Sequence, residues 1–582
     1  MLLKKTKLAG IISLVLCTTA VASTTAIVVD SSGAHDFGPY VSAMDTSSAA
    51  TGTMTSATYT QKYAQQFSYD IGAPWTYNEY CVSDSDVCKM FWNGSKADNS
   101  DGLFVWRRNI LNTYGDYNGS YESETTSSVN TIEVPPASLP LSRKVTALDG
   151  AVEVGYGTSA GKIVRRGYYG KTPLVPEFTE NGGFSSAYDA ANVKVKNSEH
   201  SVEFEKKLIV GQASVQWSNA NDTGRFNRCF NSAVNDSRAD YDQLYNCPGF
   251  DLQASFWDEK GTTASYLTGK RNWLSAGSSA TFIANAYAIN TSGFAVGFST
   301  QQIYESTSGG RARATIFKPT VESKDALSYA MTEITKPKTD AGSDYNSVIR
   351  DTVAIDITDT VYASASSSFA IADGTNSDSQ AFIVVGNRTY NQPQNRSYAT
   401  EFFTYDVKTQ ETRYPFMANP IKGASSQVSK INNDGIVVGW RDDRGEKSPT
   451  AEGSPRFQSA FIYDYKTKKS AYLDDLYCQG IDDSDVKYRF SNAISISDPD
   501  VNGNVVVVSN AFDYKNIDNY KNRLGSTPVV LTMTITADEL ANMSTTSQCP
   551  IKAKEEYSRS GGSMSWFILL PTMLLLFRRF KR

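Results

Sequence analysis

One stretch of the chain has the residue types and spacing of a calcium loop. Asp498, Asp500 and Asn502 alternate and are followed by Gly503. In calcium loops, oxygens at alternating positions converge on the ion and the glycine permits a sharp turn. The acid that usually closes such a loop is replaced here by Ser509. Asp498, Asp500 and Asn502 are therefore a candidate calcium site, with an ordinary turn as the alternative, and calcium is the only cofactor that the sequence indicates.

Other familiar catalytic constellations are missing from the sequence. The chain has two histidines, His35 and His200, which lie in polar or charged stretches typical of a protein surface. There is no H-E-x-x-H, G-x-S-x-G or phosphate-loop motif, which argues against a Ser–His–Asp or two-histidine zinc site. Carboxylate chemistry stays open, because a glycosidase needs only two acids. Acidic runs occur at 474–475 and 482–485, but no single acid receives a catalytic role.

The cysteines predict disulfides. The chain has seven cysteines, of which Cys17 lies in the leader segment described below. The remaining six are an even number, as an oxidising compartment favours, and they allow fifteen connectivities. We favour the sequential pairing, which joins neighbours along the chain: Cys81–Cys88, Cys229–Cys247 and Cys478–Cys549. A thiolate metal site is not favoured, because no C-x-x-C spacing occurs.

The first 22 residues have the layout of a secretory signal peptide. Lys4, Lys5 and Lys7 precede an apolar run from 8 to 16, and small residues at 20–22 suit cleavage. We therefore expect signal peptidase as a partner and a mature chain that begins near Ser23.

The last residues have a short apolar segment with a basic end. Gly561, Gly562 and Ser563 precede an apolar run from 566 to 577 and four basic residues within 578–582. Those twelve residues would span roughly 18 Å as a helix, short of the ~30 Å hydrocarbon core. The tail resembles the GlyGly-CTERM signal of Gram-negative surface proteins. This resemblance implies transient inner-membrane anchoring, cleavage near the glycines by a rhomboid-type protease, and release to the cell surface or the medium.

Composition favours strands and a partner other than nucleic acid. Tyr and Phe are abundant, at 33 and 27 residues, and aromatic residues favour strands. The formal charge of −5 becomes −12 once the three lysines of the leader and the four basic residues of the tail are removed. Such a surface repels phosphate backbones, so no nucleic-acid partner is expected.

A degenerate repeat runs through the mature chain. Its clearest copies span 286–297 and 428–439, each with alternating apolar residues, an Asn-x-x-Gly group and a final Val-Gly or Val-Val-Gly. Each copy predicts a β-hairpin whose turn needs positive φ at glycine. Weaker copies span 41–52, 145–155, 369–386 and 490–508, with a fragment at 208–211. A second half-unit, an aromatic strand ending in Asp-x-Lys-Thr/Gly, spans 460–467, 402–409 and 254–261.

Together the two halves give about four strands per repeat. We therefore predict an all-β fold: a β-propeller-like array of four-stranded repeats, with six or seven blades and long loop insertions. Tandem β-sandwiches are the alternative. The predicted layout is a signal peptide over 1–22, the repeat-built domain over 23–550, a linker over 551–560 and the sorting segment over 561–582.

These elements carry a second resemblance. The repeats resemble extracellular HAF repeats, although Ser459 stands where His would precede Ala460 and Phe461. Repeats, leader and tail together resemble the uncharacterised domain-of-unknown-function family 3466, which implies no known activity. We expect an exported cell-surface or secreted binding module without catalysis, whose ligand is a surface protein or glycan. The alternative is an extracellular carboxylate-dependent polysaccharide hydrolase or lyase.

Overall fold

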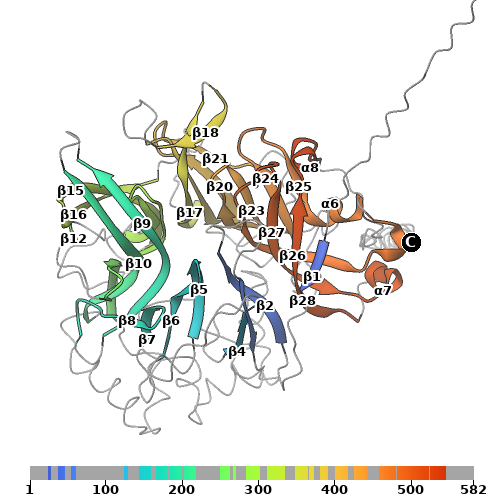
Figure 1. Ribbon diagram of the computed structural model, residues 1–582, viewed down its shortest axis with the longest axis horizontal. Helices are drawn as coiled ribbons and strands as arrows, with labels where there is room; N and C mark the ends of the chain where they lie inside the picture. Colours follow the sequence, from blue (N-terminus) through green and yellow to red (C-terminus); the bar gives the residue numbers. More distant parts are fainter. Residues whose placement is uncertain are drawn as a thin grey trace, which may run out of the picture.

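The structure, a computed structural model, is built almost entirely of strands (Figure 1). The residues that it describes are 24–27, 37–45, 54–59, 123–128, 143–158, 165–179, 183–197, 202–217, 250–261, 267–269, 284–301, 311–334, 348–364, 366–372, 380–390, 400–416, 425–442, 458–479, 481–522, 525–544 and 549. The all-β prediction is confirmed for these residues.

The described strands form seven sheets, numbered here in chain order. Sheet 1 holds β2 (Phe37–Met44), β3 (Met54–Tyr59) and β4 (Ser123–Ser128). Sheet 2 holds β5 (Arg143–Asp149), β6 (Val152–Thr158), β7 (Arg165–Tyr169) and β8 (Thr172–Leu174). Sheet 3 holds β9 (Ser185–Lys196), β10 (Glu203–Trp217) and β11 (Phe250–Trp257). Sheet 4 holds β13 (Ala284–Ile289), β14 (Ala295–Gln301), β15 (Arg311–Ser323), β16 (Ala326–Glu333) and, parallel to β16, β12 (Leu267–Gly269).

Sheets 5 to 7 complete the fold. Sheet 5 holds β17 (Ile349–Ala363), β18 (Ser368–Ile371), β19 (Phe382–Tyr390), β20 (Thr400–Asp406) and β21 (Glu411–Arg413). Sheet 6 holds β22 (Ser426–Ile431), β23 (Ile436–Asp442), β24 (Gln458–Asp464) and β25 (Ser470–Tyr472). Sheet 7 holds β26 (Tyr488–Ile496), β27 (Val505–Asp513), β28 (Thr527–Ile535) and, beside β28, β1 (Thr24–Ile27). The short helices are α6 (Leu473–Gln479), the 3₁₀ turn η5 (Asp483–Asp485), α7 (Ile517–Asn522) and α8 (Ala537–Ala541).

One strand of each sheet contacts its counterpart in the next sheet. These inner strands are β2, β5, β9, β13, β17, β22 and β26, in chain order, and β26 in turn contacts β2. The first described strand of the chain also pairs with the last, because β1 lies antiparallel to β28 (Figure 1). Contacts therefore run through all seven sheets and return from the last sheet to the first.

The apolar core lies in layers between neighbouring sheets. Val438 of sheet 6 packs with Val507 and Leu531 of sheet 7. Aromatic residues of the second half-units fill similar positions. Phe402 of sheet 5 stacks on Phe461 of sheet 6 with ring centroids 5.1 Å apart. Burying an aromatic side chain stabilises the fold by roughly 2–3 kcal/mol, so these layers hold each sheet against the next.

The clear repeats fold as predicted. Residues 286–297 and 428–439 form the hairpins β13–β14 and β22–β23, and the second half-units form β11, β20 and β24 with their turns. The prediction for 369–386 was wrong in its first strand. Gly386 of β19 pairs with Ala354 of β17, while Phe369 lies in the edge strand β18. Strand β18 and its flanking turns separate β17 from β19 in the chain, so a short hairpin pattern does not show this pairing.

The termini and most cysteines predicted to pair lie outside the described residues. One predicted pair is described: Cys478 of α6 is joined to Cys549 by a disulfide, with Cα atoms 5.2 Å apart. Residues 1–22, 551–582, Cys81, Cys88, Cys229 and Cys247 are not among those that the structure describes. Within the described part of the chain, no helix has the length and apolarity needed to cross a membrane.

Candidate functional site

A β-bulge interrupts every inner strand at a similar level. At each bulge one residue is skipped in the pairing with the neighbouring strand. The skipped residues are Ser42, Thr146, Tyr188, Tyr287, Ile355, Ser429 and Ile494. Successive side chains of a regular strand point to opposite faces, whereas a bulge re-aims them. The bulges thus allow two consecutive residues of one strand, such as Ser429 and Lys430, to line the same cavity.

In sheets 2 to 6 a glycine of the neighbouring strand lies opposite this bulge. A Cβ on Gly439 would lie 2.0 Å from the backbone oxygen of Gln427, and one on Gly297 would lie 1.9 Å from that of Asn285. Gly211 and Gly386 meet the same obstruction, at 1.9 and 2.3 Å. The sequence predicted that these glycines end the second strand of the hairpin. They lie inside that strand instead, because a residue without a Cβ lets the strand approach the bulged backbone closely.

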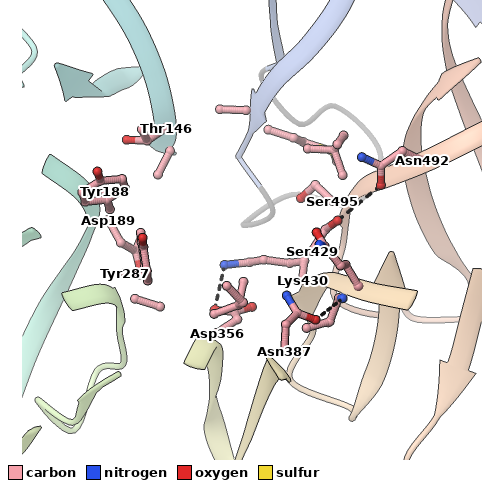
Figure 2. Close-up of a pocket in the computed structure, with 18 of the residues that line it drawn as sticks. Thr146, Tyr188, Asp189, Tyr287, Asp356, Asn387, Ser429, Lys430, Asn492 and Ser495 are labelled. Atoms are coloured by element: carbon pink, nitrogen blue, oxygen red, sulfur yellow. Dashed lines mark hydrogen bonds and ion pairs between the residues drawn. The ribbon is translucent and has the colours of Figure 1, made fainter. Parts of the chain in front are cut away.

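A cavity of about 280 Å³ lies where the inner strands meet (Figure 2). All seven inner strands contribute to its wall, together with β19 and β23. The lining residues are Ala43, Met44, Thr146, Ala147, Tyr188, Asp189, Tyr287, Ala288, Ile355, Asp356, Asn387, Gln427, Val428, Ser429, Lys430, Trp440, Asn492, Ile494 and Ser495. Hydroxyl and amide groups alternate with methyl groups and aromatic rings. Such a mixed wall is suited to orienting a small polar molecule.

Two carboxylates and one ammonium group give the cavity its charge. The Lys430 Nζ lies 3.2 Å from Asp356 Oδ1 (Figure 2), and the second Asp356 oxygen accepts a hydrogen bond of 2.9 Å from the Ile431 amide. The Asp356 side chain is 5% exposed and that of Lys430 32%. Burial lowers the pKa of Lys430, but the Asp356 and Asp189 carboxylates more than offset this and raise it. Burial also raises the pKa of Asp356, against the effect of Lys430.

Asp189 is the second carboxylate. Its Oδ2 accepts a hydrogen bond of 3.0 Å from the amide of Ile289, on the inner strand of the next sheet. Burial raises the pKa of Asp189 to about 6, Lys430 and the backbone amides oppose this rise, and Asp356 adds to it. Asp189 and Asp356 thus satisfy backbone amides of neighbouring sheets and hold negative charge at the cavity wall.

Two tyrosines flank Asp189. The Tyr188 and Tyr287 rings meet edge to face with centroids 4.8 Å apart, and Figure 2 shows them with Asp189 on one wall. Tyr156 packs behind Tyr188 at 5.8 Å, and Phe298 packs beside Tyr287 at 5.9 Å. Aromatic pairs of this geometry hold each other in place, so the tyrosine wall is preorganised.

The Asn-x-x-Gly turns join neighbouring sheets. Gly293 and Gly435 have φ of +79° and +80°, as predicted. The side-chain oxygen Oδ1 of Asn432 accepts a hydrogen bond of 2.8 Å from the Ile436 amide, and its side-chain nitrogen Nδ2 donates to the Ser497 carbonyl of the next sheet at 2.9 Å. Asn290 makes the corresponding bond to Thr358 at 3.1 Å. Asparagine therefore closes its own turn and ties it to the next sheet.

The predicted calcium ligands lie at the corresponding turn of sheet 7, where Asp500 stands at the asparagine position. Asp500 Oδ1 accepts the amides of Asn502 and Asn504 at 2.8 and 2.9 Å, and these hydrogen bonds lower the pKa of Asp500. Asp498 accepts the Asn433 backbone amide at 2.8 Å and its side-chain amide at 3.0 Å. Across the described residues, no three or more His, Cys, Asp or Glu side chains gather as metal ligands. Calcium at Asp498, Asp500 and Asn502 stays a prediction.

The acidic runs separate into a buried and an exposed set. Asp474 and Asp475 are buried in α6, and Asp474 Oδ1 accepts the Phe490 amide at 2.8 Å. The run 482–485 forms η5, none of whose residues is buried. The processing residues Gly561, Gly562 and Ser563, and both histidines, lie outside the described residues.

The cavity residues were missed at the sequence level. Asp189, Asp356 and Lys430 are far apart in the chain and belong to three different sheets. One signal was available: Asp356 stands between Ile355 and Ile357 in an otherwise apolar stretch. A charged residue inside an apolar strand indicates a buried partner or a functional wall.

Comparison with solved structures gives only slight likenesses. An inulosucrase from Halalkalicoccus jeotgali bound to kestose is 9% identical with a TM-score of 0.25, over 63% of this chain and 89% of that one. The Bacillus subtilis levansucrase is 12% identical with a TM-score of 0.24, over 66% and 93%. An oligogalacturonate lyase in complex with manganese is 11% identical with a TM-score of 0.21, over 61% and 66%. Such scores carry no argument about function.

Comparison with curated proteins gives no match. The family model described as protein of unknown function, DUF3466, matches residues 162–580, which is more than half of the chain. The protein therefore belongs to the DUF3466 family.

Proposed function

We propose that this protein is an exported β-propeller that binds a small polar ligand in its central cavity and does not catalyse a reaction. The observation that carries the proposal is the polar cavity to which all seven inner strands contribute. Ligand sites in radial folds depend on such a meeting point, because every sheet can place a side chain there.

Seven blades are the best account of the seven sheets. The inner strands contact one another in sequence and β26 contacts β2, as radial repetition requires. The pairing of β1 with β28 puts the first and last described strands in one blade. Tandem β-sandwiches would instead pair sheets face to face in two separate cores. The contacts therefore favour the propeller over the sandwiches.

The partners of the cavity charges favour binding over catalysis. Both Asp356 oxygens are engaged, one by Lys430 and one by the Ile431 amide. A catalytic acid must be able to reach a substrate proton, and this carboxylate is already committed to the fold. The remaining lining is largely hydroxyl, amide and apolar, which are groups that orient a ligand.

A polysaccharide hydrolase or lyase is the second candidate. The observation that favours it is that burial raises the pKa of both Asp189 and Asp356, and catalytic acids often have a raised pKa. An Asp189→Asn variant that abolished release of reducing sugar from a polysaccharide would establish this second function.

Export and processing belong to the same proposal. Signal peptidase would remove residues 1–22, and a rhomboid-type protease would cut near Gly561 and Gly562 after transient anchoring in the inner membrane. The protein would then bind its partner at the cell surface or in the medium of a Gram-negative cell. That partner would be a glycan or a component of a surface protein.

The experiment is a calorimetric screen of purified full-length protein against neutral sugars and small polar molecules. We expect binding that Ser429→Trp abolishes, because the indole would fill the space beside Lys430. The control is Ser366→Trp, at an exposed turn on sheet 5, with circular dichroism to verify folding. Binding that survives Ser429→Trp unchanged in a folded protein would place the ligand elsewhere and contradict the proposal.

A further inference from the structure

The cavity wall carries an excess of negative charge. Among the residues that line it are two carboxylates, Asp189 and Asp356, and one ammonium group, Lys430. The Lys430 ammonium forms its ion pair with Asp356 at 3.2 Å. The Asp189 carboxylate accepts a backbone amide, that of Ile289, at 3.0 Å. One ammonium therefore serves two carboxylates, and its direct contact is with Asp356.

The surroundings of Asp189 suit a positive charge. Tyr188 and Tyr287 lie on the same wall, edge to face at 4.8 Å, with Asp189 adjacent in the chain (Figure 2). Aromatic faces attract cations through the ring quadrupole, most strongly when water is excluded. A carboxylate beside two aromatic rings is a suitable site for a cation that also has apolar groups.

The remaining lining determines which cation fits. Ala288, Ile355, Val428 and Ile494 place apolar groups on the cavity wall. A divalent ion requires six or more oxygen ligands, and across the described residues no three or more His, Cys, Asp or Glu side chains gather as metal ligands. The volume of about 280 Å³ is close to the lower limit of small-molecule pockets. These features together select a small organic cation over a metal ion or a large ligand.

We propose that the cavity binds a small organic ammonium ion, whose charge lies at Asp189 and whose alkyl groups pack against Tyr188 and Tyr287. This inference rests on the proposed function and names the chemical class of its ligand. Phosphate and carboxylate ligands are excluded by the same excess of negative charge.

The protonation of Asp189 provides a second test of ammonium binding. Since burial raises the pKa of Asp189 to about 6, the carboxylate is largely ionised at pH 8 and largely protonated at pH 5. Lys430 on β22 and Asp356 on β17 are the charged groups that act on it, and the Tyr287 ring of β13 lies on the same wall. Affinity for the ammonium ion should fall as the pH is lowered through 6, by up to about tenfold per unit.

The test is a calorimetric titration of purified full-length protein with choline and with ethylammonium at pH 8 and pH 5. The comparison ligands are 3,3-dimethyl-1-butanol, which is the uncharged counterpart of choline, and glucose. We expect choline or ethylammonium to bind at pH 8, with little binding of the alcohol. Asp189→Asn should weaken binding about tenfold or more, because it removes the charge and keeps an acceptor for the Ile289 amide.

A matched variant separates the cavity from general surface charge. Asp325→Asn removes a carboxylate whose side chain is 62% exposed and pairs with Lys206 at 3.0 Å, and it should leave binding unchanged. If glucose or the alcohol bound as well as choline, and Asp189→Asn had no effect, the ammonium inference would be overturned while the cavity remained a binding site. If the ammonium ions bound equally to wild type, Asp189→Asn and Ser429→Trp, both proposals would be overturned.

Discussion

At the scale of single residues, three charged side chains meet in one cavity: Asp189, Asp356 and Lys430. Asp356 and Lys430 form a partly buried ion pair, and such pairs owe their stability to additional hydrogen bonds. The Ile431 amide provides one at 2.9 Å. The sequence could not reveal this group. Each member comes from a different sheet, and the bulges turn the members toward the cavity against the ordinary alternation of a strand.

The raised pKa of Asp189 predicts how the stability of the folded protein depends on pH. This pKa is raised to about 6 in the folded protein, mainly by burial, against about 3.9 in an unfolded chain. The folded protein thus binds the proton more tightly than the unfolded chain. The stability that this proton provides is present below pH ~4 and is lost as the pH rises through 6. We expect wild type to lose on the order of 1–2 kcal/mol across this interval relative to Asp189→Asn, after allowance for solvent screening.

The measurement is urea unfolding of both proteins at half-unit intervals from pH 4 to pH 7. Asp325→Asn serves as the control, since removing an exposed carboxylate should leave the decline in place. If the free energy of unfolding had the same pH dependence in wild type and Asp189→Asn, the pKa of Asp189 would not be raised in the folded protein.

At the scale of elements, the sequence pattern predicts the repeated hairpins. It does not show the bulge that lies opposite the glycine in these hairpins. The hairpins β13–β14 and β22–β23 and the aromatic strands β20 and β24 lie where the pattern placed them. The glycine that ends each copy was attributed to the strand end, because a sequence pattern does not show a bulge in the partner strand. A serine takes this position in sheets 1 and 7, and in sheet 1 it is Ser56. In sheet 7 Ser509 stands at the glycine position, and β26 has a second bulge between Phe490 and Asn492.

Gly439→Ala tests the role of the bulge. The new methyl group would lie 2.0 Å from the Gln427 oxygen, so β22 and β23 would have to separate beside the cavity. We expect a loss of about 2–3 kcal/mol in the free energy of unfolding, typical of overpacking. Gly150→Ala is the control. It has a φ of +58° and open space around it, so it should cost only about 1 kcal/mol, through backbone strain. Equal losses for the two variants, measured by urea unfolding, would contradict the bulge explanation.

At the scale of the whole molecule, contacts between the inner strands link all seven described sheets, and β1 pairs with β28. The all-β fold and the repeated hairpins followed from the sequence, as did the Cys478–Cys549 disulfide. The sequence predicted six or seven blades without deciding between them, because insertions of unequal length separate the repeats. The three- and five-stranded sheets depart from the expected four strands. The return contact from β26 to β2 joins residues more than 400 positions apart, and no local pattern predicts it. The seven bulged inner strands all contribute to the wall of one cavity.

The most direct test of the central claim is a crystal structure of the full-length protein grown at pH 8 with choline. We expect seven sheets around one cavity, with ligand density inside that cavity between Asp189 and the rings of Tyr188 and Tyr287. Ligand density on the outer loops, with ordered water alone in the cavity, would contradict the claim that the cavity is the binding site.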